Sequence, residues 1–188
     1  MNTSMNKRLK AAVVMVGLGW CVGRAEAYKN PDSILLNVAP ANAQYSVSIA
    51  SPSATPGYDF EQVNLAATTE STQAIVVTND GTVSEFFSLK TENSNGGWAP
   101  VTTTPAMNQF RLVGLFQSGQ PAASNYAVSG STVTTSFPDP AGSSYGQGGT
   151  RTTATSTKNL WLQLTMPNDV TTGSNAQTIR LYVNGQGL

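Results

Sequence analysis

Apolar residues alternate with small polar residues through most of this chain after residue 27, a period of two that is typical of β-strands with one buried face. Segments with this pattern, or with a short β-branched run, lie at 45–49, 73–78, 85–90, 110–116, 160–165 and 179–183, with shorter candidates at 34–38, 63–67 and 132–136. Pro and Gly fall between the segments, where they interrupt strand pairing or permit positive φ. No stretch after residue 27 combines a helical period with a cap.

These segments predict an all-β fold, an antiparallel sandwich of about eight or nine strands. Asn79-Asp80-Gly81 stands between two of them and predicts a tight hairpin turn that joins 73–78 to 84–90. In such a hairpin the apolar faces of the two strands meet.

The first residues are typical of a cleavable secretory leader. Lys7, Arg8 and Lys10 give it a basic start, 11–22 is apolar, and Ala25-Glu26-Ala27 offers a small-x-small cleavage site. The apolar run is shorter than the roughly 20 residues that a membrane-spanning helix needs. We expect residues 1–27 to be removed and 28–188 to form a single exported domain, extracellular, at the cell surface or periplasmic, with no transmembrane segment.

Missing residue types exclude several functions. The chain has no histidine, and its only cysteine, Cys21, lies in the predicted leader. Disulfides, Ser-His-Asp and Cys-His nucleophiles and most zinc, copper and iron sites are therefore not expected after residue 27. The charges there are few and scattered with an acidic excess, which excludes the basic stripe of a nucleic-acid-binding protein. We expect no enzyme, no metal and no cofactor.

A carboxylate-dependent hydrolase is the enzymatic alternative. Asp59 and Glu61 are two residues apart and would share one face of a strand. A glycosidase needs two carboxyl groups that flank a sugar cleft, and no aromatic-rich cleft is apparent around this pair. We expect both to be solvated surface charges.

One part of the chain resembles a known family. The stretch 74–82, with Asn79-Asp80-Gly81-Thr82, followed by Phe86-Phe87-Ser88-Leu89 and Gly97-Trp98, is similar to the motif of bacterial immunoglobulin-like modules. The closing 178–183 resembles the last hairpin of those modules. The resemblance covers roughly 61–98 and 160–184. It implies an immunoglobulin-like β-sandwich of the type found beside extracellular glycosidases and in cell-surface adhesion proteins.

Aromatic residues are the candidate binding residues. Trp161 and Tyr182 alternate with the apolar faces of their strands and would point outward if those faces form the core. An exposed Trp and Tyr platform suits stacking on a sugar or contact with a protein, whereas a loop that covers them would bury it. Tyr145 lies in the Gly/Ser/Thr-rich segment 137–157, which predicts a long loop of the kind that carries binding residues.

The predicted domain begins with residues 28–43, which include the apolar Ile34-Leu35-Leu36. This segment would either close an edge of its own sheet or pair with the edge of a neighbouring copy. We therefore expect a non-catalytic structural or adhesive module, with a protein partner or self-association at the cell surface. The alternative is a carbohydrate-binding module that holds a glycan on its exposed aromatic residues.

Overall fold

The structure, a computed structural model, describes residues 44–52, 57–127, 131–138, 151–171 and 176–187. They belong to one compact unit, Asn42–Leu188. The predicted leader 1–27 and the segment 28–43 lie outside the described residues, as does Tyr145.

The described residues form strands and one short 3-10 helix. The strands are β1 (Val47–Ser51), β2 (Thr68–Glu70), β3 (Ile75–Asn79), β4 (Glu85–Thr91), β5 (Ala99–Pro100), β6 (Gln109–Phe116), β7 (Arg151–Thr152), β8 (Thr157–Thr165) and β9 (Leu181–Gln186), and the helix is η1 (Ala123–Ala127). No helix in this part of the chain is long and apolar enough to span a bilayer.

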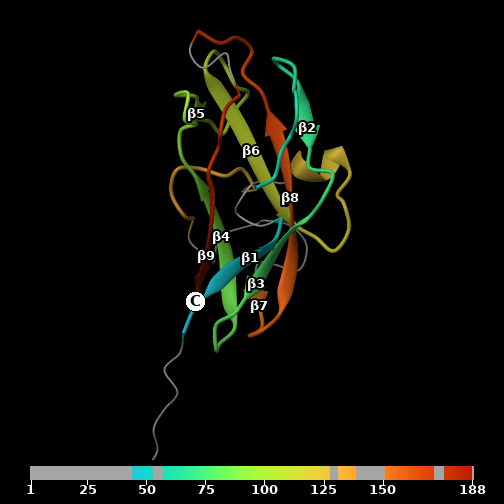
Figure 1. The fold of residues 1–188 in the computed structure, drawn as a ribbon, viewed down its shortest axis with the longest axis vertical. Helices are drawn as coiled ribbons and strands as arrows, with labels where there is room; N and C mark the ends of the chain where they lie inside the picture. The colour runs from blue at the N-terminus through green and yellow to red at the C-terminus, as the bar shows by residue number, and fades with distance from the viewer. Residues whose placement is uncertain (1–43, 53–56, 128–130, 139–150, 172–175, 188) are drawn as a thin grey trace, which may run out of the picture. The chain divides into compact units, whose positions relative to one another are not determined.

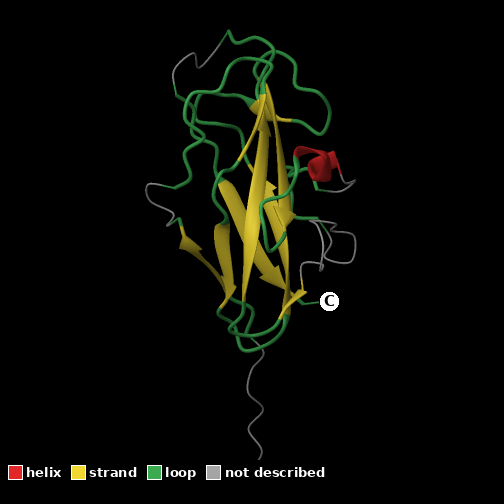
Figure 2. Ribbon diagram, turned by 90° about the vertical axis from the view of Figure 1, so that its right-hand side faces the viewer, coloured by secondary structure: helices red, strands yellow, loops and turns green. Residues whose placement is uncertain are grey.

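The strands form two sheets, which confirms the predicted all-β fold and agrees with a β-sandwich. The larger sheet has the order β1-β3-β8-β6-β5, and β2 pairs with β8 beside that path. The smaller sheet has the order β7-β4-β9. Neighbouring strands are antiparallel except β5 and β6, which are parallel. Most strands run along the long axis of the unit (Figures 1 and 2).

The main core lies between the two sheets because alternate residues of the facing strands are apolar. Its buried members are Ile75, Val77, Phe87, Leu89, Trp98, Phe110, Leu112, Phe116, Val133, Leu160, Leu162 and Leu164. The rings of Phe87 and Phe116 join the sheets, with centroids 5.5 Å apart. Gly114 leaves the space that the Leu89 side chain fills, since a Cβ there would collide with it. The predicted strand faces are thus confirmed for β6 and β8.

A second apolar cluster covers the other face of the larger sheet. Val113, Leu115 and Trp161 project from β6 and β8 and pack with Tyr126 of η1. The residues Ala123–Ala127 thus form a helical turn that buries one aromatic ring. The strand β8 is buried on both faces from Leu160 to Leu164.

The prediction of a hairpin at Asn79-Asp80-Gly81 is wrong. β3 pairs with β1 and β8, whereas β4 pairs with β7 and β9, so the turn carries the chain from one sheet to the other. The buried Asn79 side chain holds this crossing: Nδ2 donates to the carbonyls of Val83 and Thr152, both at 2.9 Å, and Oδ1 accepts from Gly81 N at 2.9 Å. The inward faces of β3 and β4 meet across the core instead of along a shared sheet.

Three of the weaker predictions also differ from the structure. Residues 63–67 precede a strand, β2, which begins at Thr68. Residues 132–136 form isolated bridges only, because the chain pairs at Thr132 with β6 and two residues later, at Thr134, with β4. The predicted loop 137–157 ends earlier than expected, since Arg151–Thr152 pairs with β4 as β7.

Candidate docking site at two strand edges

The smaller sheet ends at β9. Among the described residues β9 pairs with β4 alone, from Phe86↔Gln186 to Thr91↔Leu181. In an antiparallel ladder, alternate residues turn their N–H and C=O groups away from the partner strand. The outer side of β9 is therefore an edge able to pair with a further extended chain.

The larger sheet ends at β1. This strand pairs with β3 from Val47↔Asn79 to Ser51↔Val76, with an irregularity between Ile49 and Ser51. No other strand of the described chain pairs with β1. Each sheet thus presents one long edge strand, and we call the two together the open edges.

The open edges converge at one end of the unit. Gly187, directly after β9, packs against the ring of Tyr45, just before β1, so closely that a Cβ on the glycine would strike the phenol. Ser46 N donates to Glu85 Oε2 at 3.2 Å, which ties the start of β1 to the start of β4. The first residues of β1 are therefore fixed beside the last residues of β9.

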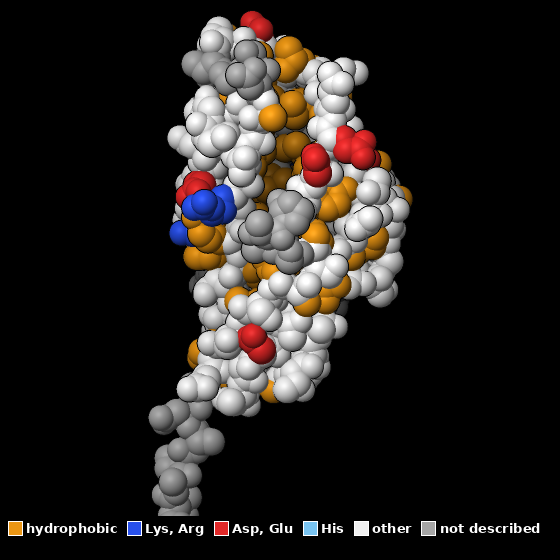
Figure 3. Space-filling model, viewed as in Figure 1, with side chains coloured by type: hydrophobic (Ala, Val, Ile, Leu, Met, Phe, Trp, Pro, Cys, Tyr) orange, Lys and Arg blue, Asp and Glu red, His pale blue; other side chains and the backbone are white. Residues whose placement is uncertain are grey.

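Apolar side chains of the open edges are only half-buried. Val47 and Ile49 of β1, Leu181 and Val183 of β9, and Ile179 just before β9 pack on the main core, and we call these five residues the apolar band. Figure 3 shows hydrophobic side chains gathering along the middle of the face that bears β1 and β9. A strand laid here would gain both main-chain hydrogen bonds and apolar contacts.

Tyr58 and Phe60 add aromatic surface to the same core. Their rings meet edge to face, with centroids 4.8 Å apart at 75°. Both are half-buried and pack on the core cluster that the apolar band also covers. The Tyr58 hydroxyl accepts a hydrogen bond from Thr72 N at 2.7 Å, which fixes the ring.

A buried carboxyl group lies where the open edges converge. Glu85 is 0% exposed, and its Oε1 has no hydrogen-bond partner among the described residues. Burial raises the pKa of Glu85, the hydrogen bond from Ser46 N lowers it, and the charge of Asp80 raises it further. Sequence reasoning missed this residue, because a Glu at the first position of a strand ordinarily faces solvent.

Asp80 holds β1 from the other side. Hydroxyl groups of Ser46 and Ser48 donate to its carboxylate and lower its pKa. Its backbone N–H donates to Ser46 O at 3.0 Å, and Thr82 N donates to Gln44 O at 3.0 Å. The residues predicted as a hairpin turn therefore anchor the start of β1.

Trp161 does not form the predicted exposed platform. Its strand phase is opposite to that of the Leu face, as expected, but η1 and Tyr126 cover it and leave 8% of it exposed. The indole Nε1 donates to Gln117 O at 3.0 Å. This residue belongs to the second apolar cluster, so of the two alternatives, an exposed platform and a ring covered by a loop, the structure has the covered ring.

Tyr182 is half-buried on the smaller sheet. Its hydroxyl donates to Glu92 Oε2 at 3.0 Å, and Glu92 also pairs with Arg180 at 3.5 Å. The ammonium group of Lys90 lies over the ring, 4.9 Å from its centroid, and 5.0 Å from the ring centroid of Phe137. Trp161 and Tyr182 lie on different sheets, so the structure does not bring them together.

The acidic pair Asp59 and Glu61 is exposed and internally bonded. Glu61 N donates to Asp59 Oδ1 at 2.7 Å, in a turn where Glu61 has φ 58°. No group of three or more metal-ligating side chains occurs within the described ranges.

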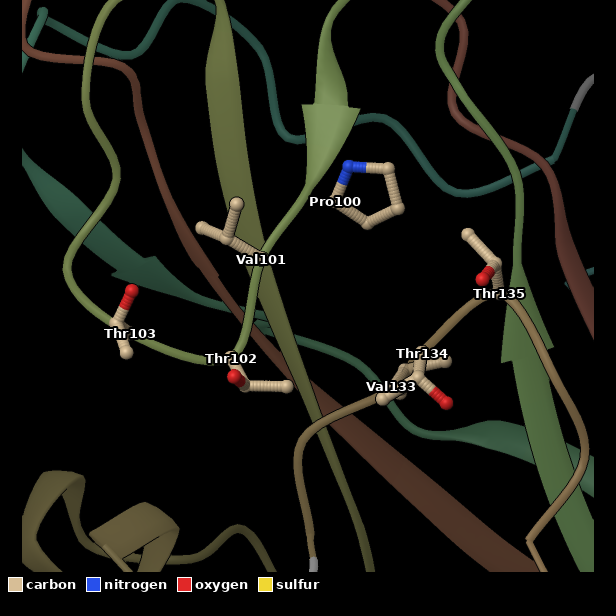
Figure 4. Close-up of a pocket in the computed structure, with 7 residues that line it drawn as sticks. All are labelled: Pro100, Val101, Thr102, Thr103, Val133, Thr134 and Thr135. Carbon is tan, nitrogen blue, oxygen red and sulfur yellow. The ribbon is translucent and has the colours of Figure 1, made fainter.

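A shallow cleft of about 360 Å³ opens elsewhere on the unit. It lies between the chain after β5 and the segment 133–135, and Figure 4 shows its lining residues on these two segments. They are Pro100, Val101, Thr102, Thr103, Val133, Thr134 and Thr135. No ionisable side chain lines it, so it offers hydroxyl and methyl groups alone.

No family model, no curated protein and no solved structure matches this chain.

Proposed function

We propose that this protein is a non-catalytic, exported structural or adhesive subunit that associates with other chains through strand edges at the cell surface. The observation that carries the proposal is the pair of open edges, β1 and β9, with a half-buried apolar band beside them. Isolated proteins usually protect such edges with charges, prolines or a covering segment. The five residues of the apolar band carry no charge.

We also propose that the two sheets are immunoglobulin-like. A seven-strand immunoglobulin domain has the order A-B-E-D in one sheet and C-F-G in the other. The order β1-β3-β8-β6 and the pair β4-β9 agree with A-B-E-D and C-F, and the strands follow one another along the chain in the same sequence. In that correspondence, the place of strand G is the outer side of β9.

Sequence features support the exported and non-catalytic parts of the proposal. The basic start, the apolar run and Ala25-Glu26-Ala27 favour a cleaved leader. The chain after that point offers neither imidazole nor thiol for catalysis.

Carbohydrate binding receives less support. Trp161 is buried, and Lys90 lies over one face of the Tyr182 ring, which removes that face for stacking on a sugar. We therefore favour protein partners over a glycan.

Light scattering on the secreted chain across a range of concentrations tests this function. We expect a mass above that of one chain, and an increase in the associated fraction with concentration. The variant Leu65→Ser is a matched control, because Leu65 is an exposed apolar residue just before β2, which pairs with β8 and with neither β1 nor β9, and its loss should leave association unchanged. A single-chain mass at every concentration would contradict the proposed function.

A further inference from the structure

We propose that residues 34–38 of a second copy of this chain add as a strand to the outer side of β9 and cover the apolar band. This inference rests on the proposed function and names the partner and the site of association. It makes each copy both acceptor, through β9, and donor, through its own amino-terminal segment.

The acceptor has the length and the chemistry of a strand site. β9 extends from Leu181 to Gln186, a span of about 20 Å at the usual rise per residue. Leu181 and Val183 turn toward the main core while Tyr182 turns away from it. A strand beside β9 would therefore place every second side chain over the core.

The donor segment matches that requirement in sequence. Ile34, Leu36 and Val38 would share one face of a strand, and Leu35 and Asn37 the other. Five residues span about 17 Å, close to the length of β9. No charged residue occurs from Ser33 to Ala43, so the segment would bring no unpaired charge to the apolar band.

Chain direction favours a second copy over the chain's own segment. β9 runs toward the end of the unit where Gly187 meets Tyr45, and the chain enters β1 from that same end. A segment 34–38 that folded back beside β9 of its own chain would run toward Gln44 and hence parallel to β9. Apart from the short parallel pairing of β5 with β6, every pair of strands among the described residues is antiparallel. A separate copy can supply the antiparallel direction without a turn of the chain back along the whole of β9.

The anchoring of β1 supports the same partner. Hydrogen bonds fix Gln44 and Ser46 to the turn 80–82 and to Glu85, so that β1 is held in its own sheet. Gln44, to which the donor segment is joined in the sequence, therefore lies at the end of the unit where the open edges converge. Residues 34–38, with four apolar side chains out of five, precede Gln44 by a short connection of five residues.

Cysteine cross-linking between two variants tests the proposal. The full chain is secreted with Cys21→Ser, so that engineered residues supply every thiol. Val183→Cys is the acceptor variant, and it is mixed in turn with the donor variants Ile34→Cys, Leu36→Cys and Val38→Cys under mild oxidation. A disulfide needs Cβ atoms about 3.5–4.5 Å apart, so Leu35→Cys and Asn37→Cys, on the opposite face, are the matched controls.

We expect the acceptor variant to form a disulfide-linked heterodimer with at least one of the three donor variants. Neither control variant should form one. A chain carrying Val183→Cys together with Leu36→Cys should then give linked multimers. A linked monomer at high dilution, with no heterodimer in the mixtures, would overturn the proposal by showing closure within one chain. Absence of all cross-links would also overturn it, and light scattering on the same samples would tell whether association itself, and with it the proposed function, still holds.

Discussion

The carboxyl group of Glu85 lies against the backbone of Gly185, in the space that a Cβ atom on the glycine would fill. These residues belong to the neighbouring strands β4 and β9 and lie near the convergence of the open edges. The glycine thus makes room for a buried acidic side chain, and the pair links sheet packing to the start of β1 through Ser46.

Gly185→Ala should destabilise the fold. The added methyl group must displace the carboxyl of Glu85, and overpacking of this kind costs about 1–3 kcal/mol in unfolding free energy. Urea denaturation measures it. Gly119→Ala is the matched control, because nothing lies within 4 Å of a Cβ at Gly119. In the double variant with Glu85→Ala the cost should largely vanish, and strictly additive effects would contradict the packing relationship.

Stability should fall as pH rises above the ordinary pKa of a glutamate. Burial raises the pKa of Glu85 from its ordinary 4.5, so the folded chain binds that proton more tightly than the unfolded chain. The contribution of this tighter proton binding to the unfolding free energy is fully present below pH 4.5 and is lost as pH rises through the raised pKa. Glu85→Gln should remove this part of the pH dependence, as measured by denaturation between acid and neutral pH.

Asp80 should contribute a pH dependence of stability with the opposite sign. Hydrogen bonds from Ser46 and Ser48 lower its pKa below 3.8, so its contribution is present above that value and is lost as pH falls further. Asp80→Asn is therefore expected to remove the strongly acid limb, and also to reduce the limb above pH 4.5, because the charge of Asp80 contributes to the raised pKa of Glu85. If Glu85→Gln changed the strongly acid limb and left the limb above pH 4.5 intact, the assignment of the buried carboxyl would be refuted.

Tyr126→Phe should leave stability unchanged or raise it. The phenol is 0% exposed, its oxygen has no partner among the described residues, and burial raises the pKa of Tyr126 to about 12. Removing an unsatisfied buried hydroxyl is worth about 1 kcal/mol of unfolding free energy. Tyr58→Phe is the contrasting variant, since it removes the hydrogen bond from Thr72 N and should be destabilising. Equal losses in the two variants would show that Tyr126 does find a partner.

Asn79→Ala should be among the most damaging substitutions in this fold. It removes three hydrogen bonds of a buried side chain and leaves the carbonyl of Thr152 without that donor, at a cost of about 3 kcal/mol or more. Asn79→Asp keeps the oxygen that accepts from Gly81 N. Its second carboxylate oxygen, however, would replace the amide donor and lie against the carbonyl oxygens of Val83 and Thr152, which repel it. Thermal unfolding should therefore rank wild type above both variants. An Asp variant as stable as wild type would contradict the assigned amide orientation.

Alternation in the sequence predicts the strand faces well, because burial between two layers repeats every second residue. Leu160, Leu162 and Leu164 enter the main core as expected. The same rule places Trp161 on the opposite face, but it cannot tell that η1, a turn within a polar loop, folds over that face. The cover depends on tertiary packing of one residue, Tyr126, in a segment with no apolar period of its own.

Strand partners are harder to predict than strands. Asn79-Asp80-Gly81 has the composition of a tight hairpin, yet the Asn79 side chain bonds to Thr152, far along the chain, and turns the connection into a crossing between sheets. The open edges could not be predicted from the sequence either, because a strand is an edge only when no other strand pairs with one of its sides. The buried Glu85 gave no signal at all, since its partner Gly185 lies a hundred positions away.

Two tryptophans occupy the two apolar clusters separately. Trp98 is buried between the sheets and Trp161 beneath η1, and the remaining one, Trp20, falls in the predicted leader. Indole fluorescence depends on local packing, so each cluster carries its own optical reporter. Trp98→Phe and Trp161→Phe would yield chains whose emission follows one layer at a time during denaturation. Whether η1 detaches before the sheets separate can thus be observed by light alone, without any attached dye.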